Sequence, residues 1–295
     1  MSPVADDVTV VVPTLGTSPY LGEAVESALA EAPAEVVVVA NGGADVELEG
    51  VRILRRDEPG RSEARNLGVE AARTPLVAFL DDDDLALPGR LERQRAALAE
   101  AWWAPLAFGR IRVVDGEGQP HDDWNRLLDK RFARVTRARA VSYEDVLAVQ
   151  APIYTSATMV RRDAFLAVGG FDAAFEAYED LDLYLRLARV GDLLPVEGEP
   201  VTTYRLHGAN TPSPLLYEGA LRVAEKHLPR TSGRARRLLL ERRVDALWGL
   251  GRAADARRAA LRALLEEPAL LVRPRFARRL VALALRQRQS EASGS

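Results

Sequence analysis

Short apolar runs alternate with amphipathic stretches along the first hundred residues of the chain. The runs have the length and valine content of buried strands, and they occupy residues 8–13, 35–40, 51–54 and 76–80. Between them, apolar side chains recur at helical spacing, which predicts helices that begin near Pro19, Ser62 and Pro88. We expect Ser62 to cap its helix. The alternation predicts an α/β fold with a parallel sheet and right-handed crossovers.

The alternation weakens after residue 104. Residues 106–114 predict one strand, whereas residues 120–140 are polar and weakly patterned, which is typical of a binding loop or a partly disordered segment. Further helices are expected at 142–149, 163–168, 179–188 and 214–227, and further strands at 157–161 and 201–206. We therefore divide the chain into an α/β domain at 1–214, with halves at about 1–104 and 105–214, and a helical region at 215–295.

Composition places the chain among globular proteins, because 47% of its residues are hydrophobic and 28% are charged. There is no cysteine, which excludes disulfides and thiolate metal sites. The first residues have neither the basic segment nor the apolar core of a signal peptide, and no apolar run approaches the length of a membrane span. We expect a cytoplasmic protein, with peripheral membrane contact left open.

The net charge of −3 hides an uneven distribution. Residues 231–295 hold 15 Arg and 6 acidic residues, a balance of +9, so the remaining residues carry −12. Arginine, leucine and alanine predict three helices there, at 234–250, 253–266 and 275–288. Three interpretations stay open for residues 231–288: packing on the α/β domain, a homodimer contact, or contact with an anionic membrane surface. No nucleic-acid-binding motif accompanies the charge, so we expect no nucleic-acid partner.

Four consecutive carboxylates, Asp81 to Asp84, follow the fourth apolar run. They would stand at the carboxyl end of a strand, where open α/β sheets bind ligands. Because adjacent acids repel one another, either a divalent cation or a solvated acidic turn would explain them. The turn after the first strand lacks GxGxxG, which disfavours a dehydrogenase-type dinucleotide site. Glu179 and Asp180 fall at a predicted helix start, where they either cap the helix or supply a general base.

Seven segments resemble, in order, the inverting glycosyltransferases of family 2, which have the GT-A fold. They are VVVPT at 10–14, VVVVANG at 36–42, GRSEARNLG at 60–68, FLDDDD at 79–84, GGFD at 169–172, YED at 178–180 and YRLH at 204–207. They cover roughly the first 215 residues, and the tail lies outside the resemblance. The resemblance implies a mostly parallel central sheet flanked by helices, with an α-helical C-terminal appendage. The first half of the domain would bind the nucleotide-sugar, and the second half would bind the acceptor and hold the base.

The resemblance also implies roles for single residues in donor binding. Asp83 matches the ligand of Mn²⁺ or Mg²⁺, and Asp81 and Asp82 match residues that face the ribose. The run of four leaves this register open by one residue, and Asp84 would start the next helix. The remaining matches to the nucleotide-sugar site are Pro13, Thr14 and Arg65. For Arg65, the alternative is an arginine on the surface of its helix. Where the family has an acid after its second strand, this chain has Asn41, which leaves the choice of base open.

For the chemical step, Asp180 matches the family's catalytic base. His207 matches a position that contributes to the metal site in some relatives, with a surface loop histidine as the alternative. The resemblance thus implies a metal-dependent, inverting transfer of a sugar from a nucleoside-diphosphate donor to the hydroxyl of a saccharide, a lipid-linked glycan or a small molecule. The alternatives are a non-catalytic nucleotide-sugar-binding protein and a nucleotidyltransferase.

Overall fold

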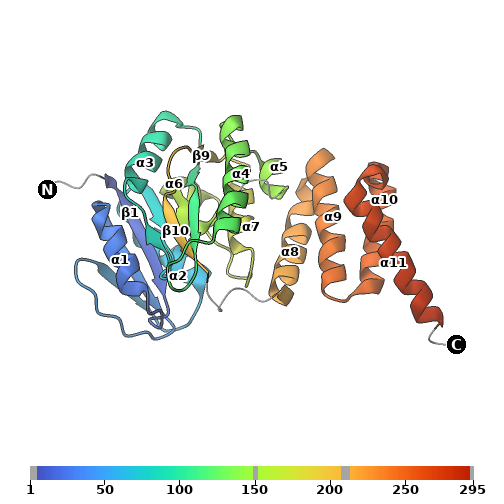
Figure 1. Ribbon diagram of the computed structural model, residues 1–295, viewed down its shortest axis with the longest axis horizontal. Coiled ribbons are helices and arrows are strands. Elements are labelled where there is room, and N and C mark those ends of the chain that lie inside the picture. Colours follow the sequence, from blue (N-terminus) through green and yellow to red (C-terminus); the bar gives the residue numbers. More distant parts are fainter. Residues whose placement is uncertain (1–4, 149–151, 207–212, 293–295) are drawn as a thin grey trace. The chain divides into compact units, whose positions relative to one another are not determined.

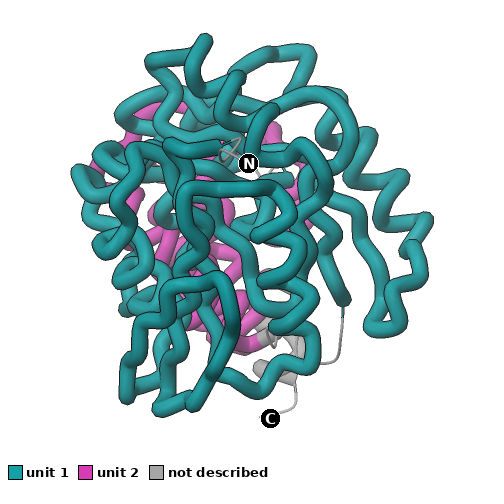
Figure 2. The backbone as a smooth tube through the Cα atoms, turned by 90° about the vertical axis from the view of Figure 1, so that its left-hand side faces the viewer, with its two compact units in different colours: residues 1–174, 179–210 teal, residues 175–178, 211–295 magenta. Residues whose placement is uncertain are grey.

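The computed structural model describes residues 5–148, 152–206 and 213–292 (Figure 1), and the chain divides into two compact units (Figure 2). Unit 1 comprises residues 1–174 and 179–210, and unit 2 comprises residues 175–178 and 211–295. The sequence placed a boundary after residue 214 and assigned everything before it to one domain. The structure differs in that the short segment Phe175–Tyr178 belongs with the C-terminal helices.

Seven strands form the central sheet of unit 1, in the order β3-β2-β1-β4-β8-β6-β9. The pairs among β1, β2, β3 and β4 are parallel, as is β6 with β9, and only β8 runs antiparallel to its neighbours β4 and β6 within this sheet of described residues. The predicted, mostly parallel sheet is therefore confirmed. The strands are β1 (Ala5–Thr14), β2 (Pro33–Asn41), β3 (Arg52–Arg56), β4 (Leu76–Phe79), β6 (Leu106–Gly109), β8 (Thr158–Arg161) and β9 (Leu194–Val196).

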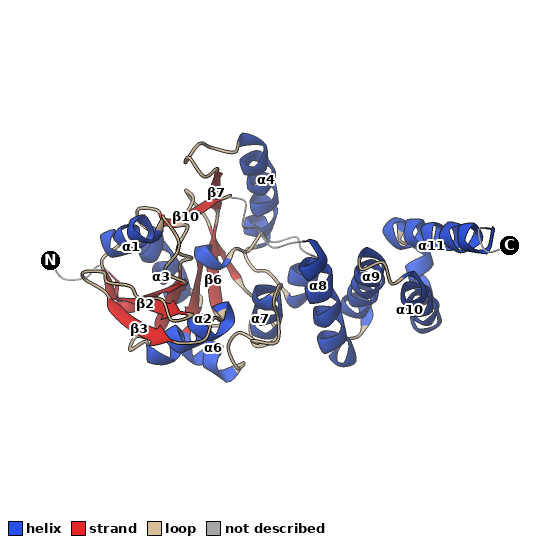
Figure 3. Cartoon of the chain, turned by 90° about the horizontal axis from the view of Figure 1, so that it is seen from below, coloured by secondary structure: helices blue, strands red, loops and turns tan. Residues whose placement is uncertain are grey.

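Helices cover both faces of this sheet (Figure 3). On one face, α1 (Leu21–Ala30) and α3 (Arg90–Glu100) share a core with Val10 and Val12 of β1. On the other face, α2 (Arg61–Ala71) packs against the side chain of Val11. Because side chains alternate along a strand, a strand covered on both faces must be apolar throughout, which explains the valine run of β1. Ser62 does not cap α2: the cap position is Gly60, and Ser62 is buried inside the helix.

The predicted strand at 106–114 is two strands in two sheets. β6 ends at Gly109, and β7 (Ile111–Val114) joins a small sheet of order β5-β10-β7 with β5 (Leu85–Ala86) and β10 (Thr202–Arg205). A Cβ atom on Gly109 would lie 2.5 Å from a methyl carbon of Val201. The chain can therefore change sheets here because glycine allows the two backbones to approach closely.

The prediction of a loop or disordered segment at 120–140 was wrong. Residues Asp122–Ala138 form α4, which buries Leu128, Phe132 and Val135 and leaves most of its other side chains exposed. The buried positions recur at intervals of four and three residues, which is a narrow helical face. The other elements of unit 1 are α5 (Tyr143–Leu147), η1 (Thr155–Ala157), α6 (Arg162–Ala167) and α7 (Glu179–Leu187).

Unit 2 is helical and has its own apolar core. Its elements are α8 (Ser213–His227), η2 (Leu228–Arg230), α9 (Gly233–Gly249), α10 (Ala253–Glu266), η3 (Pro268–Val272) and α11 (Pro274–Ala292). The buried residues of this core include Leu270 of η3 and four alanines of α10, which are Ala256, Ala259, Ala260 and Ala263. In the described part of the chain, no helix combines the length and the hydropathy that crossing a membrane requires.

Candidate active site

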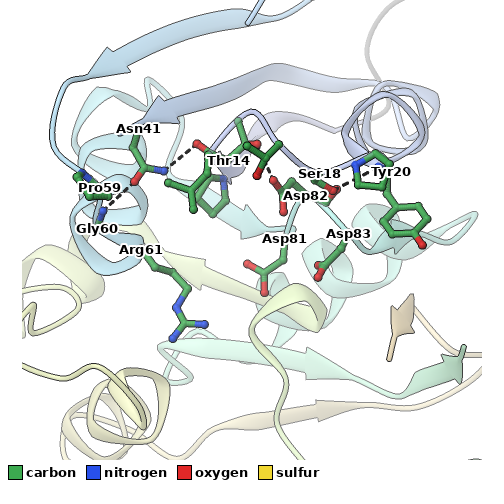
Figure 4. Close-up of a pocket in the computed structure, with 14 residues that line it drawn as sticks. Thr14, Ser18, Tyr20, Asn41, Pro59, Gly60, Arg61, Asp81, Asp82 and Asp83 are labelled. Atoms are coloured by element: carbon green, nitrogen blue, oxygen red, sulfur yellow. Dashed lines mark hydrogen bonds between the residues drawn. The ribbon is translucent and has the colours of Figure 1, made fainter. Parts of the chain in front are cut away.

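A cavity of about 600 Å³ opens at the carboxyl ends of β1, β2 and β4 (Figure 4). Thr14 ends β1, Asn41 ends β2, and the acidic run follows β4 directly. Parallel strands bring their carboxyl ends to one edge of the sheet, so these three segments meet there. The residues predicted to bind the donor or the metal that line the cavity are Pro13, Thr14, Asn41, Asp81, Asp82 and Asp83.

Three of the four consecutive carboxylates line this cavity, but they do not face the same way. The side chains of Asp81 and Asp83 point to one side, and that of Asp82 points back toward Thr14 (Figure 4). The hydroxyl of Thr14 donates a hydrogen bond of 2.5 Å to Asp82 Oδ2. Burial raises the pKa of Asp82 to about 6, and Asp83 and Asp81 add to this while the Thr14 hydrogen bond opposes it. Asp81 and Asp83 are therefore the two carboxylates of the run that point the same way in the cavity.

Asp84 serves the scaffold rather than the cavity. It does not start the next helix as expected, since α3 begins at Arg90. Its side chain is buried, and Oδ1 accepts a 2.9 Å hydrogen bond from the backbone N–H of Arg205 in β10. The Arg205 side chain also donates from Nε to the carbonyl oxygen of Asp83 at 3.1 Å. Arg205 of the small sheet thus holds the acidic turn through both its backbone and its side chain.

Asn41 joins three segments at the cavity floor. Its Nδ2 donates to the carbonyl oxygen of Thr14 and its Oδ1 accepts from the N–H of Gly60, both at 2.8 Å (Figure 4). The amide therefore fixes the end of β1 against the start of α2. Reading a base through these same atoms would require the amide to share or exchange these hydrogen bonds.

Arg65 is fully buried, so the alternative of a surface helix arginine was wrong. Its guanidinium donates to Asp81 Oδ1 and, at 3.2 Å, to Glu179 Oε1, and it lies 5.3 Å from the ring centre of Phe171. Burial alone would raise the pKa of Asp81, but the positive charges of Arg65 and Arg61 hold this pKa below its ordinary value. Arg61 also pairs with Glu179, at 2.9 Å. The two arginines thus connect the acidic run to the start of α7.

Asp180 stands in the first turn of α7, directly after Glu179. Its Oδ1 accepts a 2.6 Å hydrogen bond from the N–H of Leu181. Burial and the adjacent charge of Glu179 raise the pKa of Asp180 to about 6, while Arg65 and Arg61 oppose the shift. A carboxyl with a pKa in this range can accept a proton near neutral pH, as a general base must.

Most of the cavity residues lie in a part of the chain that is similar to a known protein family. Residues 9–165, more than half of the chain, match the model of the family described as glycosyl transferase family 2. The chain belongs to that family. This confirms the resemblance seen in the sequence.

Two curated relatives of the family illustrate the match. The chain is 31% identical over 205 residues to the pre-mycofactocin glycosyltransferase of Mycobacterium tuberculosis, covering 65% of this chain and 41% of that one. It is 27% identical over 192 residues to the uncharacterized glycosyltransferase YwdF of Bacillus subtilis, covering 62% of this chain and 68% of that one. The chain therefore spans about two fifths of the mycobacterial relative's length and about two thirds of the length of YwdF.

Solved structures of S. aureus TarS share the fold, which confirms the GT-A prediction. The structure of TarS residues 1–349 matches with a TM-score of 0.60 at 16% identity, over 83% of this chain and 73% of that one. The complex of the same TarS fragment with UDP-GlcNAc matches with a TM-score of 0.61 at 15% identity, over 96% of this chain and 92% of that one. A match over 96% of the chain extends into residues 211–295, which carry none of the sequence motifs.

Several residues of the family-like segments build the scaffold. The amide of Asn66 donates to the carbonyl oxygen of Phe171 and accepts from its N–H, both at 2.8 Å, and so fastens the 169–172 turn to α2. Gly68 lets α2 approach β1, because a Cβ there would lie 2.4 Å from a methyl carbon of Val11. Gly170 has a φ of +64°, which a residue with a side chain rarely adopts. These residues hold α2, which carries Arg65, against β1 and the 169–172 turn.

The carboxylates that face the cavity suit a hard divalent cation. Asp81 and Asp83 offer oxygen ligands of the kind that Mg²⁺ and Mn²⁺ prefer. Among the described residues, no group of three His, Cys, Asp or Glu side chains converges to hold a metal ion. Mg²⁺ commonly takes one or two carboxylates and completes its shell with water and substrate phosphates, so a two-carboxylate site fits. The predicted ligand His207 lies outside the described residues.

Arg61 and Tyr20 are among the cavity residues that were not predicted from the sequence. Arg61 lines the cavity, and it stands four residues before Arg65 on the same face of α2, so the helical spacing in the 60–68 segment was a usable signal. Tyr20 also lines the cavity, and its hydroxyl donates to the carbonyl oxygen of Gly116 at 3.0 Å. That contact joins residues 96 positions apart, and no local pattern indicates it.

Proposed function

We propose that this chain transfers a sugar from a nucleoside-diphosphate donor to an acceptor hydroxyl, with inversion at the anomeric carbon and with a divalent cation. The observation that supports this most is the charge arrangement of the site. Asp81 and Asp83 face one cavity, and Arg65 links Asp81 to Glu179, the residue directly before the proposed base Asp180. TarS, whose fold this chain shares, has been solved with UDP and with UDP-GlcNAc, which supports a nucleotide-sugar as the donor.

The cavity suits a nucleotide in size and lining. Its volume of about 600 Å³ falls within the range of roughly 300–1,000 Å³ usual for small-molecule sites. Pro13, Leu15 and Pro59 offer apolar surface to a base, and Asp82 with Thr14 offers hydrogen-bonding groups to a ribose. Asp83 would hold the metal, with Asp81 beside it. The bound ion would supply positive charge to the departing diphosphate.

The proposed chemistry is a single displacement. The acceptor oxygen forms a bond to the anomeric carbon as the bond from that carbon to the diphosphate breaks, and the proton of the acceptor passes to Asp180. The ion pairs with Arg61 and Arg65 hold the side chain of Glu179 in place next to Asp180. The nearby negative charge of Glu179 raises the pKa of Asp180, which makes Asp180 a stronger base. The diphosphate leaves with the electron pair of the broken bond.

The test is a screen of UDP-, GDP-, ADP- and dTDP-sugars with purified protein and Mn²⁺ or Mg²⁺. Thermal shift identifies the donor, because a ligand of the folded state raises the melting temperature. Donor hydrolysis or transfer is then followed by release of the nucleoside diphosphate, and the anomer of the product is read by NMR. A product that retains the donor's configuration, or full turnover by Asp83→Ala without dependence on metal, would contradict the proposal.

The same experiment separates the alternatives. A non-catalytic binding protein would give donor binding by calorimetry but no diphosphate with any acceptor. A nucleotidyltransferase would release pyrophosphate from a nucleoside triphosphate. The turn at residues 15–17, Leu-Gly-Thr, contains no lysine or arginine to hold a triphosphate, which weighs against the second alternative.

A further inference from the structure

Unit 2 exposes aliphatic side chains on α10 and on η3, the segment that leads into α11. Leu265, in the last turn of α10, is 84% exposed, and Val272, at the end of η3, is 83% exposed. Leu261 and Leu271 are also exposed. The segment η3 is five residues long and packs against both α10 and α11. We call these four residues the aliphatic edge.

The aliphatic edge is the outward side of a helix whose other side is already buried. Ala256, Ala260 and Ala263 of α10 pack in the core of unit 2. The opposite row, Arg258, Leu261, Arg262 and Leu265, has the i, i+3, i+4, i+7 spacing of one helical face, and all four residues are exposed. Leucine and arginine thus share the solvent-facing side, so packing within unit 2 does not explain the leucines.

The two helices next to η3 also carry exposed arginines. Arg262 on α10 and Arg278 on α11 are exposed, as is Arg275 at the start of α11. Of the neighbouring acids, Glu266 pairs with Arg236 and Glu267 pairs with Arg237 at 3.2 Å. Arg275 is itself paired with Asp245 at 3.1 Å, so the exposed charge that bears on a partner is that of Arg262 and Arg278. Residues 231–295 as a whole carry a balance of +9.

The combination of charge and aliphatic surface selects one kind of partner. A second copy docked through the same face would bring these arginines against their own copies, which is electrostatically unfavourable. A nucleic acid would satisfy the arginines but leave Leu265 and Val272 in water. An anionic lipid bilayer accepts both, since aliphatic side chains enter the headgroup–acyl boundary while arginines meet lipid phosphates.

We propose that the aliphatic edge and its arginines dock unit 2 on anionic membranes. This inference does not depend on the proposed catalytic activity. It predicts that the full chain sediments with vesicles of phosphatidylcholine and phosphatidylglycerol but not with vesicles of phosphatidylcholine alone. Binding should weaken as salt rises, because the lipid surface charge is screened.

Two sets of variants separate the aliphatic and the charged contributions. Leu265→Glu with Val272→Glu should lower the vesicle partition coefficient about tenfold or more, because both side chains lose their place in the bilayer. Arg262→Gln and Arg278→Gln should each lower it about fivefold, which corresponds to the ~1 kcal/mol expected for a basic residue near an anionic surface. The matched control is Val190→Glu in unit 1, where the parent side chain is 61% exposed; it should bind like the parent.

The opposing outcomes are equally specific. Equal binding to neutral and anionic vesicles, or equal loss in the Val190→Glu control, would overturn the proposal. So would parent-like vesicle binding by the Leu265→Glu, Val272→Glu protein, provided that circular dichroism shows it folded. Self-association lost in that variant would indicate a second copy as the partner, and RNA or duplex DNA binding that needs only the arginines would indicate a nucleic acid.

Discussion

Arg65 lies between two carboxylates from distant parts of the chain, Asp81 and Glu179. A buried arginine is costly to desolvate, and it is retained here because both partners accept its hydrogen bonds. Through Glu179 the same charge cluster reaches Asp180, whose pKa it helps to set. The cavity residue Asp81 and the proposed base Asp180 therefore belong to one charge cluster centred on Arg65.

The proposed base gives a pH prediction. Because the pKa of Asp180 is raised to about 6, transfer should rise with pH and level off above an apparent pKa near 6. Asp180→Asn removes the base and should lower kcat by roughly 10²–10⁴ while leaving donor affinity nearly unchanged. Rates from pH 5 to 8 and calorimetric donor titration check both. A parent-like rate for Asp180→Asn would rule out Asp180 as the base.

Stability serves as the control for this variant. A carboxyl whose pKa is higher in the folded state favours folding when protonated, and that contribution is lost as pH rises toward 6. At pH 7.5 the charged Asp180 therefore costs stability, and asparagine removes the charge. The melting temperature of Asp180→Asn should match or exceed that of the parent at pH 7.5, so lost activity cannot be ascribed to unfolding.

Arg205 gives a second prediction, as a positioning residue. It donates to the carbonyl oxygen of Asp83 and lies 3.9 Å from the ring centre of Tyr20, and it also pairs with the exposed Glu23. Arg205→Lys keeps the charge but loses the planar group, so the divalent-cation concentration for half-maximal rate should rise about tenfold. Glu23→Gln, which removes only a surface pair, should stay within about twofold. Equal effects in the two variants would show that the Asp83 contact is unimportant.

Elements with long apolar runs were predicted correctly from the sequence. The helix α4, which buries only a narrow apolar face, was not. The valine runs of β1 and β2 and the acids after β4 place the cavity edge from sequence alone. In α4, only Leu128, Phe132 and Val135 are buried, and the many charged residues between them obscured the helix. The split between β6 and β7 depends on how closely Gly109 approaches Val201, a contact 92 residues apart that local patterns do not contain.

The packing of α2 on β1 gives a third prediction. Gly68→Ala would place a carbon 2.4 Å from a methyl carbon of Val11, so α2 must shift, at a cost of about 1–3 kcal/mol in the free energy of unfolding. Gly22→Ala is the matched control, because no atom lies within 4 Å of its added carbon. It should be neutral or stabilising by up to about 1 kcal/mol. Urea unfolding of both variants checks this; an unperturbed Gly68→Ala would show that the interface can relax freely.

For the whole molecule, the helical unit is not a simple C-terminal appendage. Phe175 and Ala177 are buried and belong to unit 2, although they precede α7 by only a few residues. Within unit 2, Arg222 of α8 lies 5.6 Å from the ring centre of Phe175, and a Cβ on Gly219 would lie 2.3 Å from the carbonyl oxygen of Ala177. Local sequence could not indicate this, because Phe175–Tyr178 is too short to show a periodic pattern and its partners lie more than thirty residues further along the chain.

Truncation tests this organisation. A chain ending at residue 210 would leave Phe175 and Ala177 without the helices that bury them, directly before Glu179 and Asp180. We expect this fragment to melt at a lower temperature than the full chain, and to lose transfer activity beyond any loss of membrane contact. Calorimetry and assays with a soluble acceptor check this. A fragment with the parent's melting temperature and turnover would show that residues 1–210 are self-sufficient.

The assignment of Phe175–Tyr178 to unit 2 also has a consequence for the evolution of such proteins. A C-terminal module joined at one point can be exchanged by a single recombination event. This unit is built from two separate segments of the chain, and exchanging residues 211–295 alone would set new helices against the host's own Phe175–Tyr178. Any replacement for α8 would need a residue as small as Gly219 opposite Ala177. The helical unit should therefore descend together with its catalytic partner, and positions 175–178 should co-vary with α8.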